Sequence, residues 1–274
     1  PGFSHLSLLW KILPFPELGI AGAALGTVIA TAFSLLCFFI YSFSNTIQNN
    51  FNFRDTSFKY NIIVKHVKLT WPICQVQASF HIGITLFVVI MGMIGTLEMA
   101  ATNIMFRIFN LAVMPAIGIG EACGSLVGYY LGKNNPDKSL ISIKDSYKYS
   151  FFIMGGFALC WVLFTDPIIS IFTSDTKLKE ILIPLLRFTS LFALTESINV
   201  VCFSALEGAG DVKFVSRLMH FYVWILFLPL SYFTGIYLGI GLWGPWYSLL
   251  FAVIFVTVSL FIRIKQGKWK YIVV

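Results

Sequence analysis

Long runs of apolar residues, separated by short polar segments, dominate the chain. There are seven, at 19–43, 69–94, 99–131, 147–172, 181–206, 214–238 and 241–262. Each has the roughly 20 residues that a helix needs to cross a hydrocarbon layer about 30 Å thick. The pattern therefore predicts seven transmembrane helices.

Helices are favoured over barrel strands because the runs are apolar on every side, as in 153–164 and 221–230. Strands of a membrane barrel would instead alternate apolar and polar positions over about 10 residues. Backbone groups in lipid must be hydrogen bonded within the protein, which leaves helices or closed barrels. We predict an all-α integral membrane protein.

Composition supports this prediction, since 58% of the residues are hydrophobic and 11% are charged, against about 25% charged in soluble domains. Most of the 19 basic residues stand in alternate loops. These residues are Arg54, Lys59, Lys65, Lys68, Lys133, Lys138, Lys144, Lys148, Lys213, Arg217, Arg263, Lys265, Lys268 and Lys270. The positive-inside rule then predicts a multi-pass protein of the cell membrane with a cytoplasmic C-terminus and extracytoplasmic first residues. We attribute the net charge of +7 to topology and expect no nucleic-acid partner.

One carboxylate stands in the middle of the fifth run. Glu196 shares a helical face with Phe192, Asn199 and Phe203, at i−4, i+3 and i+7. An ionised carboxylate in hydrocarbon costs a few kcal/mol, so its presence there predicts a function. It can take up a proton or, with further oxygen ligands, bind a hard cation. The alternative is a structural glutamate satisfied by its neighbours.

The third run carries a polar stripe and a ladder of small residues. Asn103, Arg107, Asn110 and Glu121 fall near one face and predict the wall of a hydrated cavity. Alternatively, Arg107 pairs with an acid, and Glu121 is wetted at the cytoplasmic edge. The ladder predicts close packing against another helix, as in GxxxG motifs. Its members are Ala116, Gly120, Gly124, Gly128 and Gly132.

In the second run, Gln77, His81 and Thr85 share a face at i, i+4 and i+8. They line a cavity or form hydrogen bonds to neighbouring helices. The five cysteines show no metal-ligand spacing, so we expect no metal and no cofactor.

Two glycine-rich starts, at 18–26 and 238–244, lie 220 residues apart and suggest two halves of about six helices each. A basic segment with an amphipathic pattern precedes the second run and would connect the halves. The predicted parts are the end of an N-terminal half (1–43), a cytoplasmic connector (44–67), a six-helix bundle (68–264) and a basic cytoplasmic tail (265–274).

Several stretches together resemble the multidrug and toxic compound extrusion (MATE) family. They are 19–24 with 30–31, 114–120, 126–128 with 131–132, and 205–211. The resemblance covers nearly the whole chain, which would correspond to helices six through twelve of a twelve-helix, two-bundle transporter. The N-terminal bundle of the same protein would then be its missing partner.

This resemblance implies export of small organic compounds, often cationic, in exchange for Na⁺ or H⁺. Glu196 matches the coupling carboxylate of the family's tenth helix. Two positions depart from the family: Glu207 replaces an arginine, and Phe80 replaces a glutamate that many members carry. Glu121 is a possible substitute for that second acid. Phe80, Phe192 and Phe203 are candidates to stack on flat cationic substrates.

Three other functions remain to be weighed. A lipid-linked oligosaccharide flippase shares the two-half architecture but should prefer a basic cavity, for which Arg107 is the candidate. A receptor or non-transporting scaffold predicts no solute flux. An intramembrane enzyme is disfavoured because no nucleophile, metal-protease or nucleotide-binding motif is visible.

Overall fold

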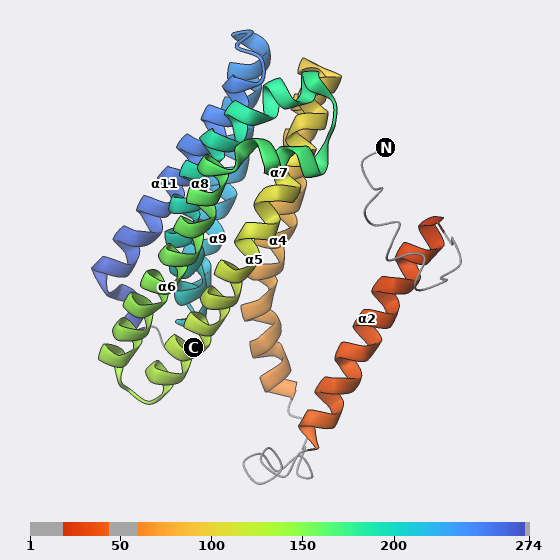
Figure 1. The fold of residues 1–274 in the computed structure, drawn as a ribbon. Helices are drawn as coiled ribbons and strands as arrows, with labels where there is room; N and C mark the ends of the chain where they lie inside the picture. The colour runs from red at the N-terminus through yellow and green to blue at the C-terminus, as the bar shows by residue number, and fades with distance from the viewer. Residues whose placement is uncertain (1–18, 44–59, 272–274) are drawn as a thin grey trace. The chain divides into compact units, whose positions relative to one another are not determined.

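The computed structural model describes residues 19–43 and 60–271 (Figure 1). The described residues are almost entirely helical and contain no strand. They belong to two units, 1–64 and 65–274, which are described separately. The predicted connector lies largely outside the described residues, and the first 18 and last three residues lie wholly outside them.

The second unit is a helical bundle. Its long helices are α4 (Tyr60–Ile94), which begins in the first unit, α5 (Thr96–Gly132), α6 (Pro136–Leu163), α8 (Thr176–Gly208) and α11 (Trp243–Gln266). A short helix, α7 (Thr165–Phe172), follows α6. Between α8 and α11 the chain forms α9 (Val212–His220), η1 (Phe221–Phe227), α10 (Leu228–Tyr232) and η2 (Phe233–Tyr237). A last turn, η3 (Lys268–Tyr271), packs under α11, where Trp269 is buried.

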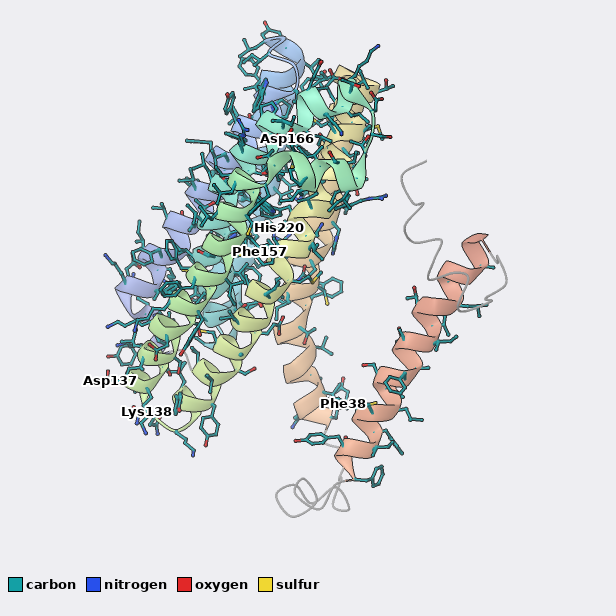
Figure 2. All side chains as sticks on the ribbon, in the orientation of Figure 1. Phe38, Asp137, Lys138, Phe157, Asp166 and His220 are labelled. Atoms are coloured by element: carbon teal, nitrogen blue, oxygen red, sulfur yellow. The ribbon has the colours of Figure 1, made fainter. Side chains whose placement is uncertain are left out.

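Six helical spans of the described chain are long and apolar enough to cross a membrane, and a seventh is reached if α6 and α7 form one broken span. The seven predicted runs therefore coincide with the observed spans. Figure 2 shows Asp137 and Lys138 at the end of the bundle where α6 begins, and Asp166 at the opposite end. The span through α6 thus traverses the bundle.

The prediction of one continuous fourth span was wrong at its end. The helix axis turns by 87° between α6 and α7. Pro167 stands in the first turn of α7, where its missing N–H is tolerated. Extension of α6 through this residue would place the proline ring against the carbonyl of Leu163.

The glycine ladder of α5 packs against α8, as predicted, at three of its four glycines. A Cβ added to Gly124 would lie 2.6 Å from the carbonyl oxygen of Ser204, and one added to Gly128 would lie 3.0 Å from that of Gly208. Gly132 faces open space. The two helices therefore approach through their backbones, which only residues without a side chain permit at these positions.

A core of aromatic rings joins α4, α5, η1 and α11. The Phe87 ring of α4 lies 5.8 Å from Phe106 of α5, 5.2 Å from Phe227 of η1 and 5.9 Å from Trp246 of α11, measured between centroids. Phe87 is fully buried. These ring contacts are at distances that favour edge and tilted packing, and they fix α4 to the rest of the bundle.

A buried ion pair joins the residue before α9 to the end of α11. The Nε of Arg263, near the end of α11, donates to Oδ2 of Asp211 at 2.7 Å. The guanidinium also lies 4.7 Å from the centroid of the Phe214 ring. Asp211 immediately precedes α9 and is buried. The pair therefore ties the start of α9 to the end of α11.

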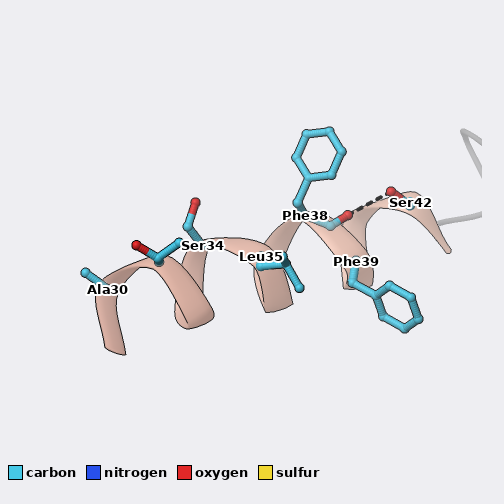
Figure 3. Close-up of a pocket in the computed structure, with 7 residues that line it drawn as sticks. Ala30, Ser34, Leu35, Phe38, Phe39 and Ser42 are labelled. Carbon is cyan, nitrogen blue, oxygen red and sulfur yellow. Dashed lines mark hydrogen bonds between the residues drawn. The ribbon is translucent and has the colours of Figure 1, made fainter. Parts of the chain in front are cut away.

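In the first unit, α2 (Gly19–Ser42) is apolar along its length, and its side chains are exposed from Ala24 to Tyr41. Figure 3 shows a shallow hollow along this helix, lined from Ala30 to Ser42. Because α2 alone lines it, the hollow is the ridged surface of one helix. A helix apolar on all sides requires lipid or other helices around it.

Candidate functional site

The predicted carboxylate lies inside the bundle. Glu196 is half-buried midway along α8, and its Oε2 accepts a hydrogen bond from Nδ2 of Asn199, one turn later, at 3.1 Å. Neither ion pair of the described residues includes Glu196. Within the described part of the chain, an amide donor and no fixed cation therefore accompanies this carboxylate.

An amide oxygen and a tyrosine accompany this carboxylate. The Oδ1 atom of Asn199 is buried and has no hydrogen-bond partner among the described residues. Tyr222, a buried residue of η1, lies within electrostatic range of Glu196. Carboxylate, amide and hydroxyl oxygens are ligands for a proton or a hard cation. The described residues contain no cluster of three His, Cys, Asp or Glu side chains, so any cation here would be held mainly by neutral oxygens.

The residues that share the face of Glu196 differ in exposure. Phe192 is buried, with its ring centroid 5.6 Å from Phe188 and 6.1 Å from Trp246. Asn199 and Phe203 are half-buried. The structure therefore places Phe192 in the aromatic core, one turn from Glu196.

The polar stripe of α5 lies on the outside of the described bundle. Asn103, Arg107, Asn110 and Glu121 are all exposed. Nδ2 of Asn103 donates to the carbonyl of Met99 at 2.9 Å, and Asn110 makes the equivalent bond within its own helix at 2.8 Å. No hydrogen bond or ion pair in the described part of the chain joins this stripe to Glu196.

The candidates on α4 are also exposed. Gln77, Phe80, His81 and Thr85 lie on the surface of the described bundle. Thr85 Oγ1 donates to the carbonyl of His81 at 2.9 Å, and the His81 ring packs edge-on against Phe80 with centroids 5.9 Å apart. Two polar surfaces, on α4 and α5, are thus left without a partner in this unit.

Two neighbours of the acidic residues were not predicted from the sequence. The first is Tyr222 of η1, which lies within electrostatic range of Glu196. The second is Glu207, treated only as a departure from the family. It lies within electrostatic range of Glu121, and its Oε1 is buried without a hydrogen-bond partner among the described residues. Glu207 could have been identified from the sequence, because an acidic residue directly before a glycine at a helix end is unusual in an apolar span.

Comparison with known proteins decides the family. The MatE family model matches residues 72–233, more than half of the chain. The chain belongs to the MatE family. This membership confirms the predicted family and, with the apolar helices, the predicted all-α membrane fold.

Its relatives include a probable multidrug resistance protein and an uncharacterized transporter. The chain is 25% identical over 272 residues to the probable multidrug resistance protein NorM of Thermotoga maritima, covering 98% of this chain and 58% of the relative. It is 27% identical over 248 residues to the uncharacterized transporter YisQ of Bacillus subtilis, covering 89% and 53%. The chain thus spans little more than half the length of these relatives.

Solved structures of MATE transporters have the same fold as this chain. An outward-facing multidrug resistance MATE transporter aligns with a TM-score of 0.80 at 21% identity, covering 93% of this chain and 58% of that one. A MATE crystal structure in the straight conformation aligns at 0.82 with the same identity and coverage.

Proposed function

We propose that the chain is the C-terminal part of a secondary transporter that exports organic, often cationic, compounds by antiport with Na⁺ or H⁺. The observation that carries this proposal is Glu196, a half-buried carboxylate in a membrane helix with one amide donor and no cationic partner among the described residues. A carboxylate kept in such a place, without a partner that neutralises it, is suited to reversible cation binding.

The proposed mechanism uses competition for this carboxylate. Entry of the coupling cation from outside neutralises Glu196 and weakens the hold on a cationic substrate, which leaves outward. Each ligand drives the cycle only by binding one state more tightly than the other. In this mechanism the described bundle moves as one body against the N-terminal bundle.

The exposed polar residues support a cavity. Polar and charged side chains in a membrane span face protein or water, not lipid. The stripe of α5 and the polar face of α4 are exposed in this unit, so we propose that they face an aqueous cavity shared with the N-terminal bundle. The basic loops support a cytoplasmic location for the start of α4 and the end of α11.

A flippase for a pyrophosphate-linked substrate is the second architecture to consider. It would require several cations on the cavity wall. Of the residues proposed for that wall, Arg107 is the one permanent cation, and it stands beside Asn103 and Asn110. We therefore favour an organic-cation exporter.

The test is Glu196→Gln in the full-length protein, reconstituted in proteoliposomes with a fluorescent organic cation and an imposed H⁺ or Na⁺ gradient, each in turn. Glutamine keeps the shape but cannot ionise. We expect gradient-driven export to fall at least about tenfold, which corresponds to about 1.4 kcal/mol of coupling.

Glu180→Gln is the matched control, because Glu180 is an exposed residue of the same helix. It should transport like the wild type. Unchanged export by Glu196→Gln would reject the coupling role, whereas no flux from the wild-type protein under either gradient would favour a scaffold or receptor.

A further inference from the structure

A groove of about 600 Å³ lies between α4 and the segment that joins α9 to η1. Gln75 lines it from α4, and Arg217 and His220 line it from α9. Phe221, Trp224 and Ile225 of η1 complete the wall and are exposed. This groove is separate from the Glu196 site, since neither Glu196 nor Asn199 lines it.

The polar end of the groove offers hydrogen-bond donors and, among the described residues, no carboxylate. No Asp or Glu is among the described residues that line it. Arg217 uses Nε to donate to the carbonyl of Lys213 at 3.2 Å and takes part in neither ion pair of the described chain. His220 Nδ1 lies 2.7 Å from the carbonyl of Ser216. Because a carbonyl can only accept, this nitrogen carries the proton, and Nε2 is left for another partner.

The groove changes from cationic to apolar along the helix axis. Arg217 precedes Trp224 by seven residues, or about 10 Å of helix. The headgroup layer on each side of a bilayer is some 5–7 Å thick, so a guanidinium at headgroup depth places Trp224 and Ile225 beside the acyl chains. In Figure 2, His220 lies between the two ends of the bundle, nearer the middle than Lys138.

The backbone at this wall is also unusual. The chain passes from α-helix to π-helix at Phe221, where the groove turns apolar. π-helical turns are rare and occur frequently at functional sites. Here the π-turn presents Phe221, Trp224 and Ile225 to the groove on the side facing α4.

We propose that this groove binds an anionic phospholipid of the leaflet at which α4 and α9 begin, with its phosphate on Arg217, His220 and Gln75 and an acyl chain along Trp224 and Ile225. Basic pockets between transmembrane helices on the cytoplasmic side bind such headgroups in other membrane proteins. Charge complementarity selects an anionic lipid over a zwitterionic one, and the apolar wall selects a lipid over free phosphate.

The experiment measures the thermal unfolding midpoint of the full-length protein in detergent, titrated separately with phosphatidylglycerol, phosphatidylcholine and inorganic phosphate. A ligand that binds the folded state raises the midpoint with its concentration. We expect phosphatidylglycerol to do so and the other two to do much less. Arg217→Gln should weaken the apparent affinity for phosphatidylglycerol about fivefold, as expected for the loss of one basic contact worth about 1 kcal/mol.

The control is Lys144→Gln, which removes an exposed lysine of α6 outside the groove and should leave the lipid response unchanged. Gln75→Leu alters the opposite wall and should also weaken the response, which keeps the test decisive if Arg217→Gln fails to fold. Equal responses of Lys144→Gln and both groove variants would overturn the proposal. So would equal stabilisation by the two lipids, or by phosphate and phosphatidylglycerol. The readout is binding, so its failure leaves the transport proposal unaffected.

Discussion

A carboxylate halfway along an apolar membrane helix raises the free energy of the folded protein unless a partner or a bound cation stabilises its charge. Glu196 has one amide donor at 3.1 Å and no cation paired with it in the described chain. The nearby Asn199 oxygen is also left without a donor there. The carboxylate and the buried Asn199 oxygen thus retain accepting capacity that a proton or a small cation could use.

Asp211 illustrates the opposite case, a buried carboxylate whose charge is neutralised by a fixed cation. Its side chain is 6% exposed, and it is held by Arg263 at 2.7 Å. Removal of one partner of a buried ion pair costs several kcal/mol, because the other charge remains buried. Asp211→Asn should therefore destabilise the full-length protein by on the order of 3 kcal/mol, measured as a lower unfolding midpoint.

An exposed ion pair of the same bundle provides the control. Lys148 and Asp145 lie 3.1 Å apart with side chains 70% and 50% exposed, and such pairs contribute about 0–1 kcal/mol. Asp145→Asn should leave the midpoint nearly unchanged. Equal effects of the two substitutions would show that the Asp211–Arg263 pair does not hold α9 to α11.

Sequence could predict the position of Glu196 but not its surroundings. A single acid in an apolar run is visible from composition alone, and Asn199 follows from helical periodicity. Tyr222 comes from a segment 26 residues later in the chain, and helical periodicity cannot bring it within electrostatic range of Glu196. Phe192 stays a predicted cavity residue, and the burial of its ring in the aromatic core could not be predicted, because neighbours on one helical face can contact different helices.

At the scale of the helices, spans were predictable because length and apolarity determine them in a membrane. The break at Phe164 was not, although Thr165, Asp166 and Pro167 resemble the start of a new helix. The π-turns η1 and η2 have no comparable signal. Their sequences are apolar and aromatic, as in an ordinary span, and their geometry depends on packing.

The contact between α5 and α8 depends on glycine. A side chain at Gly124 would collide with the backbone of Ser204, which cannot rotate away. Overpacking of this kind typically costs about 1–3 kcal/mol. Gly124→Val should therefore lower the unfolding midpoint of the full-length protein.

Gly118→Val is the matched control for this contact. It lies in the same helix, and a Cβ there meets nothing within 4 Å. Both substitutions introduce the same β-branched residue, so propensity contributes equally to each. If Gly118→Val destabilises the protein as much as Gly124→Val, the backbone contact is not the cause.

At the scale of the whole molecule, the chain covers 58% of a relative such as the Thermotoga maritima protein. The bundle it forms has its own core, yet the polar faces of α4 and α5 are exposed in it. Such faces in a membrane protein require water or another bundle. The second bundle would supply the opposite wall of the cavity, and transport would belong to the pair.

The proposed exchange requires the coupling cation and the substrate to compete for Glu196. The most direct measurement is the dissociation constant of an organic cation from the full-length protein in detergent, determined as H⁺ and Na⁺ are raised in turn. In the wild type and in Glu180→Gln, one of these cations should weaken substrate binding. In Glu196→Gln the dissociation constant should no longer depend on that cation. An equal dependence in all three proteins would show that the two ligands do not compete for Glu196.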